Sequence, residues 1–209
     1  MPSSAAPDFD PAIAPGEPLT LFAEWLDTAM RSEVAAPHAM TLATVSPAGA
    51  PTARTVLLHD FHPGDDSGYL GFASNGNSPK GIDLATDDRA ALVFHWREQH
   101  RQVRLTGRVH AASDAENAAD FRNLSARARA ATIAVPQSAP EPDQAETERL
   151  LAAADQILAA DPHYAPPTWK LYRLVPDSVE FWQGQPRTPQ QRLLYQRDPG
   201  PWATTMLWP

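Results

Sequence analysis

The chain contains no cysteine and no long hydrophobic run. Without thiols it can form neither a disulfide framework nor a thiolate metal site. No apolar run approaches the roughly 18 residues of a transmembrane helix. The first residues, MPSSAAPDFDPAIAPGEP, lack the basic and apolar segments of a signal peptide. We therefore expect a protein of the cytoplasm that makes no membrane contact.

The sequence also lacks an excess of basic charge. Its formal net charge is −8 at pH 7, whereas a broad nucleic-acid footprint needs a basic face. We therefore expect no nucleic-acid partner, and any bound anion must be held by a few local arginines and lysines. The seven histidines are scattered without an i, i+4 pair, so we expect no metal site. The nucleophile-elbow, zinc-protease and P-loop motifs are absent as well.

The length of 209 residues suits one domain with decorations. Such a chain can bury most of its apolar surface without disulfides or metals. Residues 1–17 are rich in proline, alanine and serine, and we expect them to form a flexible arm. Residues 18–209 are expected to form the single domain.

Hydrophobic periodicity predicts many short strands and a few helices within that domain. Strands are expected within residues 39–49, 52–61, 65–74, 89–96, 101–112, 169–176, 177–184 and 191–198, with a further one within 202–209. Helices are expected at 19–34, at 79–86, from 113 through the 120s and at 144–160. Regularly spaced strands with late helical insertions indicate a mainly β fold with α, an antiparallel barrel with helical excursions.

Three cations could together hold an anion: Arg54, Lys80 and Arg192. Lys80 is expected in the first turn of a helix capped by Ser78, where free N–H groups and the helix dipole suit a phosphate. Spacing alone nevertheless favours three solvated surface charges. Four further side chains could bind the edge or the face of a heterocycle. If each is considered alone, a role in the core or in a loop is the favoured interpretation. These residues are Gln102, Gln137, Ser138 and Trp182.

Taken together, these residues and their surroundings resemble the pyridoxine (pyridoxamine) 5′-phosphate oxidase family, whose members are dimeric FMN split barrels. The resemblance runs from about Pro18 to Pro209. The segments that carry it are, in order, PLTLFAEWL, AMTLATVSPAGAP, RTVLL, GFASNGNSPKG, RAALVFHW, RQVRLTGRV, PQS, VEFWQGQP and RLLYQRDPGPW. It implies an FMN-binding split β-barrel of antiparallel strands with peripheral helices, and a homodimer with FMN at the subunit interface.

The resemblance also implies which residues bind FMN, and that they come from both subunits. The implied residues are Arg54, Thr55, Val56, Leu57, Leu58, Ala73, Ser74, Lys80, Gln102, Gln137, Ser138, Trp182 and Arg192. The match is incomplete at two places. Pro79 stands where family members have arginine or serine beside the lysine, and Ala73 stands where they have an aromatic residue.

The substrate positions depart further from the family pattern. The family's Arg-Leu-His segment falls on residues 188–190, which read Thr-Pro-Gln, and Arg187 lies one place early. The lysine that follows the R-x-V-L-L strand is His59. The tyrosine, arginine and serine of the substrate-phosphate pocket fall on Asp120, Leu124 and Ala128.

Replacing the cations at these positions should severely weaken the binding of a phosphorylated substrate, because each charge-assisted contact contributes roughly 1.5–3 kcal/mol. The cofactor positions are mostly kept while the substrate positions are replaced. This difference predicts a changed substrate and not general decay of the site. The residues expected to contact the substrate are His59, Arg187 and Gln190.

We therefore expect an FMN-dependent oxidase that takes a hydride from a small, non-phosphorylated heterocycle and passes the electrons to dioxygen. A role in natural-product biosynthesis, such as phenazine-type oxidation, follows only by analogy within the family. Three alternatives stay open. The first is a genuine pyridoxamine/pyridoxine 5′-phosphate oxidase with a rearranged substrate loop. The others are a non-catalytic flavin-binding protein and a related barrel that binds heme or a deazaflavin.

Overall fold

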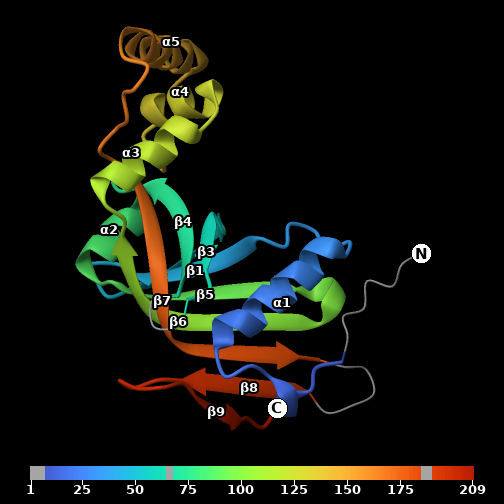
Figure 1. Cartoon of the computed structure of the whole chain (residues 1–209). Coiled ribbons are helices and arrows are strands. Elements are labelled where there is room, and N and C mark those ends of the chain that lie inside the picture. Colours follow the sequence, from blue (N-terminus) through green and yellow to red (C-terminus); the bar gives the residue numbers. More distant parts are fainter. Residues whose placement is uncertain (1–7, 65–67, 185–189) are drawn as a thin grey trace.

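A single curled antiparallel sheet organises the chain (Figure 1). The computed structural model describes residues 8–64, 68–184 and 190–209. Its strands are β1 (Ala39–Val45), β2 (Pro51–Leu57), β3 (Asp60–His62), β4 (Tyr69–Asn75), β5 (Arg89–Trp96), β6 (Arg101–Ala111), β7 (Trp169–Gln183), β8 (Gln191–Gln196) and β9 (Ala203–Met206). They are ordered β2-β1-β5-β6-β7-β4-β3, and β8 and β9 continue from β7. This arrangement confirms the predicted barrel of antiparallel strands.

The helices lie outside the sheet. They are η1 (Pro11–Ile13), α1 (Pro18–Arg31), α2 (Pro79–Thr86), η2 (Arg97–Gln99), α3 (Asp114–Asn123), α4 (Ala126–Ala134) and α5 (Gln144–Ala160). Helices α3, α4 and α5 project from the end of the sheet near β4, whereas α1 lies beside the strands at the other end (Figure 1). No helix in the described part of the chain is long and apolar enough to cross a membrane.

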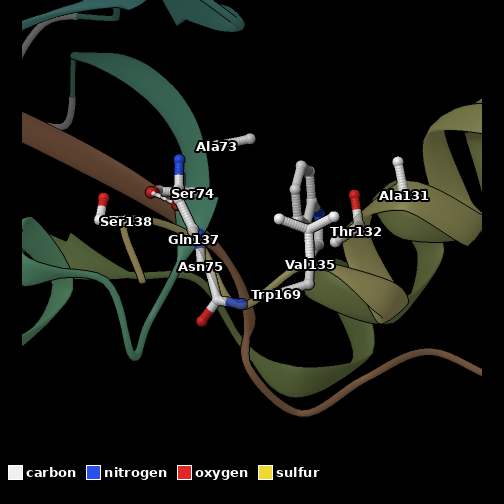
Figure 2. A pocket seen from close by; sticks show the side chains of 9 residues that line it. All are labelled: Ala73, Ser74, Asn75, Ala131, Thr132, Val135, Gln137, Ser138 and Trp169. Carbon is white, nitrogen blue, oxygen red and sulfur yellow. Dashed lines mark hydrogen bonds between the residues drawn. The ribbon is translucent and has the colours of Figure 1, made fainter. Parts of the chain in front are cut away.

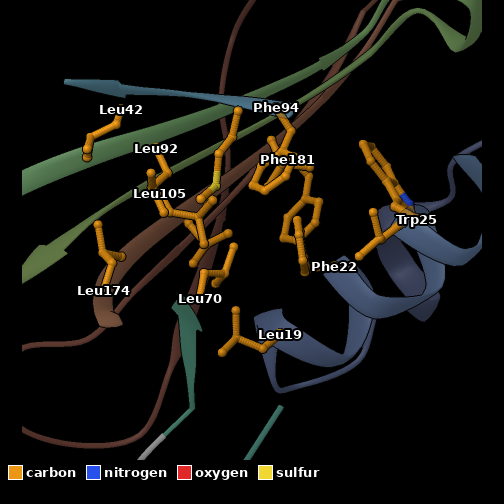
Figure 3. Close-up of a cluster of buried hydrophobic side chains, with 14 of the residues drawn as sticks. Leu19, Phe22, Trp25, Leu42, Leu70, Leu92, Phe94, Leu105, Leu174 and Phe181 are labelled. Atoms are coloured by element: carbon orange, nitrogen blue, oxygen red, sulfur yellow. The ribbon is translucent and has the colours of Figure 1, made fainter. Parts of the chain in front are cut away.

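The main core forms where α1 covers the inner face of the sheet. Helix α1 repeats apolar residues at helical spacing, and Phe22 and Trp25 on that face are buried. Phe22 packs on Phe94 of β5 with ring centroids 4.9 Å apart, and Trp25 contacts the edge of Phe181 of β7 at 5.2 Å (Figure 3). Helices α4 and α5 instead pack through a small separate cluster centred on Ala130, Ala134 and Ala154.

Several predicted elements are confirmed closely. The helices expected at 79–86 and 144–160 are α2 and α5, and the strand expected at 89–96 is β5. Ser78 caps α2 as predicted. Strand β6 alternates as a half-buried strand does, because Val103, Leu105 and Gly107 are buried while Arg104, Thr106 and Arg108 are exposed.

The single strand predicted over residues 52–61 is wrong. The chain forms β2 and then β3, because it changes partners between them. Leu58 N donates to the carbonyl of His38, beside β1, whereas His59 N donates to the carbonyl of Gly71 in β4, each at 2.8 Å. The continuous helix predicted from 113 is also interrupted, since Leu124 is extended and Ser125 starts α4 by accepting from the Ala128 amide at 3.2 Å.

The two strands predicted at 169–176 and 177–184 are one strand, β7. Pro176 lacks an N–H group, which favoured a break at this point. The structure accommodates it with a bulge, because Thr106 pairs with Ser178 while Gly107 pairs with Pro176 and leaves Asp177 unmatched. Strand β7 therefore pairs with β4 along its first half, with β8 along its second half and with β6 from Tyr172 to Gln183.

Residues 8–17 run along the sheet and α1. Phe9 contacts the Trp25 ring edge-on at 5.2 Å, and the Tyr195 hydroxyl donates to the carbonyl of Pro15 at 2.7 Å. The flexibility expected of an arm over residues 1–17, and the domain boundary at residue 18, stay predictions.

We expect Gly107→Ala to lower the free energy of unfolding by about 1–3 kcal/mol, as overpacking does. An added Cβ would lie 2.1 Å from the carbonyl oxygen of Val175 and 2.8 Å from Cα of Pro176, so the bulge would have to shift. Urea denaturation measures the change. Gly16→Ala is the matched control, since no atom lies within 4 Å of its added Cβ. Equal stabilities of the two variants would contradict this account of the bulge.

Candidate functional site

A buried cation lies at the start of α2. Lys80 is only 8% exposed, and its Nζ donates to the Ser78 hydroxyl at 3.2 Å. It forms no ion pair with any carboxylate in the described part of the chain. Burial lowers the pKa of the Lys80 ammonium, and the nearby Arg54 charge lowers it further. An anion bound at this helix end would favour the charged ammonium and so oppose both effects on the pKa.

Arg54 is held firmly beside that lysine. Its two Nη atoms donate to the hydroxyls of Thr44 and Thr52 at 2.7 and 2.8 Å, and Nη2 lies 3.4 Å from the carboxylate of Asp83. Burial alone would raise the pKa of Asp83, but hydrogen bonds from the two threonines and the Arg54 charge outweigh it and lower the pKa. Asp83 therefore stays ionised and neutralises Arg54, which leaves Lys80 as the cation available to a phosphate.

Strand β2 carries the other residues expected from the R-x-V-L-L motif. It pairs with β1 alone, so one edge of its backbone is unpaired within the described sheet. Arg54, Val56 and Leu58 are half-buried, while Thr55 and Leu57 are exposed, Leu57 at 55%. An exposed leucine on an open strand edge suits contact with a ligand or with another chain.

A cavity of about 490 Å³ opens between β4, α4 and the start of β7 (Figure 2). The residues that line it are Ala73, Ser74, Asn75, Ala131, Thr132, Val135, Gln137, Ser138 and Trp169. None of these side chains is charged. Ala73, Ser74, Gln137 and Ser138 are among the predicted cofactor residues, so the structure brings this part of the predicted set together.

The two ends of the cavity differ in chemistry. In Figure 2, Ser74, Gln137 and Ser138 gather at one end, and Ala131, Thr132, Val135 and Trp169 line the other. Gln137 Oε1 accepts from the Ser74 hydroxyl at 3.1 Å and from the Asn75 amide at 3.2 Å. These bonds fix the amide with its Nε2 donors left for a ligand. Ser138 has a left-handed backbone with φ of 70°, a strained geometry that often occurs at ligand sites.

The apolar end is backed by a chain of hydrogen bonds that we did not predict. Trp169 Nε1 donates to Asp120 Oδ2 at 2.8 Å, and His59 Nε2 lies 2.6 Å from Asp120 Oδ1. Phe121 also meets the Trp169 ring edge at a centroid distance of 6.0 Å. The sequence identified His59 and Asp120 as two replaced positions, and this shared departure was the available signal that they touch.

The remaining predicted residues lie on the outer face of the sheet. Gln102 of β6 pairs with Trp182 of β7, which pairs with Arg192 of β8. Trp182 Nε1 donates to Gln190 Oε1 at 3.0 Å, so Gln190 lies with this group and is not joined to His59. Arg192 forms an ion pair with the buried Glu180 at 2.8 Å. Arg187 lies outside the described residues.

Strand β7 separates these two groups within one chain. Ser74 pairs with Lys170 near the start of β7, whereas Gln102 and Arg192 pair with Trp182 near its end. Figure 1 shows β7 bending as it passes from one end of the sheet to the other. The structure therefore does not bring all the predicted cofactor residues together in a single copy.

Comparison with known proteins identifies related chains. A sequence profile described as "Pyridoxamine 5′-phosphate oxidase" matches residues 26–157, and one described as "Pyridoxine 5′-phosphate oxidase C-terminal dimerisation region" matches residues 169–209. A pyridoxine/pyridoxamine 5′-phosphate oxidase of Caulobacter vibrioides is 37% identical over 95% of this chain and 88% of its own. A similarly named protein of Ralstonia nicotianae is 42% identical over 97% of this chain and 91% of its own.

Solved structures agree with this relationship. PhzG from Burkholderia lata, solved with tetrahydrophenazine-1-carboxylic acid, superposes with a TM-score of 0.88 at 28% identity. The match covers 99% of this chain and 100% of that chain. A pyridoxamine 5′-phosphate oxidase-related, FMN binding protein of Nostoc punctiforme has a TM-score of 0.72 at 24% identity over 94% and 99% of the two chains, and supports the fold alone.

We expect Lys80→Met to weaken FMN binding by roughly ten- to hundredfold, since a charge-assisted hydrogen bond contributes about 1.5–3 kcal/mol. Riboflavin lacks the phosphate, so its affinity should change little. Flavin fluorescence during titration of the apo-protein measures both affinities. Lys170→Met is the control, because that lysine is paired with Asp114 at 2.9 Å. Equal losses for FMN and riboflavin in the Lys80 variant would exclude a phosphate contact.

Proposed function

The chain belongs to the pyridoxamine 5′-phosphate oxidase family, and we propose that it is a homodimeric oxidase of a small, non-phosphorylated heterocycle. Membership makes it an FMN-dependent oxidoreductase. The proposal concerns the substrate, dioxygen as electron acceptor and the place of FMN between two subunits. A cytoplasmic location stays a prediction from the sequence.

The uncharged lining of the cavity carries the proposal about the substrate, which would lie at the Val135 and Trp169 end, next to the residues expected to hold FMN. A phosphate bears between one and two negative charges at neutral pH and is held in proteins by cations or by clustered N–H donors. None of the nine lining residues is a cation. The nearest charged group joined to the lining by a hydrogen bond is the Asp120 carboxylate, which repels anions. This electrostatic setting supports a ring without a phosphate.

The residues of the site have distinct proposed roles. Lys80 and the first turn of α2 hold the FMN phosphate, and Asp83 keeps Arg54 in place beside it. Gln137 presents its amide to the edge of a ring, and Val135 and Trp169 keep water from the apolar end of the cavity. When bound, FMN supplies the hydride-accepting chemistry, while the protein supplies binding and orientation.

A second copy of the chain would complete the site. The profile named for dimerisation covers β7, β8 and β9, which carry Trp182 and Arg192. These residues and Gln102 form one row on the outer sheet face, at the opposite end of β7 from Ser74. We infer that this row meets the Lys80 region of the other subunit. A closed two-fold arrangement would then create two equivalent FMN sites.

The curated relatives favour one other candidate, a genuine pyridoxine/pyridoxamine 5′-phosphate oxidase, because they carry that name at 37–42% identity. In that case residues 185–189, which lie outside the described structure, would have to supply the missing cation, and Arg187 is the residue able to do so. The ligand in the Burkholderia lata structure, tetrahydrophenazine-1-carboxylic acid, is a reduced nitrogen heterocycle with a carboxylate and no phosphate. It favours the first proposal if its ring nitrogens face Asp120 and its carboxylate is directed away.

The two candidates differ in which compound reduces the bound flavin. We expect a reduced phenazine carboxylic acid to bleach the oxidised flavin band under anaerobic conditions, whereas pyridoxine 5′-phosphate at millimolar concentration leaves it unchanged. Stopped-flow absorption measures both reactions, with dithionite confirming that the flavin is reducible. Rapid bleaching by pyridoxine 5′-phosphate would establish the second candidate. If dithionite alone reduced the flavin, the phenazine-type substrate would be excluded.

The dimer proposal predicts complementation between two defective chains. Lys80→Met and Arg192→Ala should each lose FMN affinity. In a mixed dimer, one site would combine the intact Lys80 of one subunit with the intact Arg192 of the other. With random pairing about a quarter of all sites should recover tight binding. Differently tagged chains, copurified and titrated with FMN, measure this fraction. No recovery in the mixed dimer would show that each chain builds its own site.

A further inference from the structure

We propose that Asp120 determines the charge selectivity of the substrate cavity. Together with His59 and Trp169 it forms a fixed polar edge, called here the Asp120 edge, in which Trp169 lines the cavity and Asp120 and His59 are joined to it by hydrogen bonds. This edge accepts hydrogen bonds from planar nitrogen heterocycles that are neutral or cationic where they meet it, and it disfavours anions. The inference rests on the proposed function and adds the chemical class of the substrate and the residue that selects it.

The Asp120 edge follows the outer side of β4. His59 N donates to the carbonyl of Gly71 at 2.8 Å, and Trp169 pairs with Asn75. Side chains two apart on a strand share a face, so positions 71, 73 and 75 lie on the same side of β4. His59 is therefore beside one end of this row and Trp169 beside the other, joined by the carboxylate of Asp120. Ala73, between them, lines the cavity.

The Asp120 carboxylate is held in place because helix α3, which carries it, is fixed by several contacts. Helix α3 begins with a capping box between Ser113 and Glu116. Asn117, buried one turn later, accepts from Leu171 N of β7 at 2.8 Å and donates to the carbonyl of Ala112 at 3.1 Å. Asp120 follows on the same helix, and its neighbour Phe121 is fully buried. A carboxylate fixed in this way is preorganised and loses little freedom on binding a ligand.

Asp120 keeps acceptor capacity after binding its two neighbours. A carboxylate offers about four lone-pair sites, and the indole of Trp169 and the imidazole of His59 occupy one on each oxygen. The side chain of Asp120 is 16% exposed and that of His59 is 35% exposed, so both are partly accessible. An N–H group of a ring stacked near Trp169 is the complementary donor.

Three cations packed around α3 are engaged elsewhere, and Arg122 of α3 itself lies about 200° around the helix from Asp120. Lys170 pairs with Asp114 at 2.9 Å, and Arg173 pairs with Glu116 at 2.9 Å and lies 3.8 Å from Asp60. Arg129 lies over the ring of Phe121 and donates to the carbonyls of Pro162 and Tyr164. Within the edge, Asp120 contacts the His59 imidazole and no lysine or arginine of the described residues. An anionic substituent directed at this edge would therefore meet the Asp120 carboxylate without an arginine or lysine beside it.

The test compares two ligands that differ only in a phosphate. 4-Deoxypyridoxine and its 5′-phosphate share one ring and lack the C4′ oxygen, so they cannot be oxidised there. Their dissociation constants are measured on the FMN-loaded protein from the perturbation of the flavin spectrum. We expect the native protein to prefer the unphosphorylated ring. Asp120→Asn, which keeps the shape and removes the charge, should shift the ratio of the two constants at least tenfold toward the phosphate.

Three variants separate selectivity from a structural effect. Asp114→Asn, made in a Lys170→Met background so that no cation is freed, removes the same charge from the same helix at a side chain that is 93% exposed, and should leave the ratio unchanged. Trp169→Phe keeps a ring but loses the hydrogen bond to Asp120, so the affinities for the two ligands should fall equally. His59→Lys adds a cation to the edge and should shift the ratio in the same direction as Asp120→Asn. It provides the test if the asparagine variant does not fold.

The outcomes distinguish the two proposals. An unchanged ratio in Asp120→Asn, or in His59→Lys where that variant must serve, would overturn the role of Asp120 and leave the non-phosphorylated substrate intact. A native protein that binds the phosphorylated ring more tightly would overturn the proposed substrate class itself. An equal shift in Asp114→Asn would also overturn the specific role of Asp120, because it would show that any charge on α3 has the same effect.

Discussion

The continuity of β7 is the constraint on which the arrangement of the site depends. This strand forms one side of the ladder with β6, and its two halves pair with different partners, β4 and β8. Trp169 at its start borders the cavity, and Trp182 near its end belongs to the row on the outer sheet face. The bulge opposite Gly107 keeps the strand unbroken at Pro176. If the strand ended there, the two halves of the site would lose their fixed relation.

The charged residues around α2 and around α3 differ in a way that agrees with separate cofactor and substrate parts of the site. Around α2, Asp83 neutralises Arg54 and leaves the buried Lys80 with only a hydroxyl partner. Around α3 the charge has the opposite sign, because the carboxylate of Asp120 contacts an imidazole and an indole and no arginine or lysine of the described residues. A buried cation such as Lys80 without a carboxylate partner is costly and is usually retained for a ligand. The first setting suits the phosphate of the cofactor, and the second suits an uncharged or cationic ring.

The sequence predicts the fold better than it predicts the site. Local signals locate α2 through Ser78 and Pro79, and alternation assigns the faces of β6. Local signals fail where pairing between distant segments determines how far a strand extends. Pro176 suggests a strand end, and only its place opposite Gly107 shows that β7 continues.

The same limit applies to the site. Ser74 and Gln137 meet as the resemblance implied, but the contact between His59 and Asp120 joins residues 61 positions apart. The spacing of these residues in the sequence does not predict such a contact. Trp169 was assigned only to a strand, and its role at the cavity depends on α3 and α4, which no motif places beside it.

The packing of α4 against α5 has a consequence for the dynamics of the cavity. The buried residues between the two helices are Ala130, Ala134 and Ala154, with larger aliphatic side chains only partly buried around them, whereas the barrel core buries large aromatic and aliphatic side chains. Small side chains bury less apolar area than large ones, so we expect this helical pair to have a lower local stability than the sheet. One wall of the cavity belongs to that weaker unit and the other to β4. If part of the molecule opens while the strands stay folded, the expected place is therefore the α4 wall of the cavity.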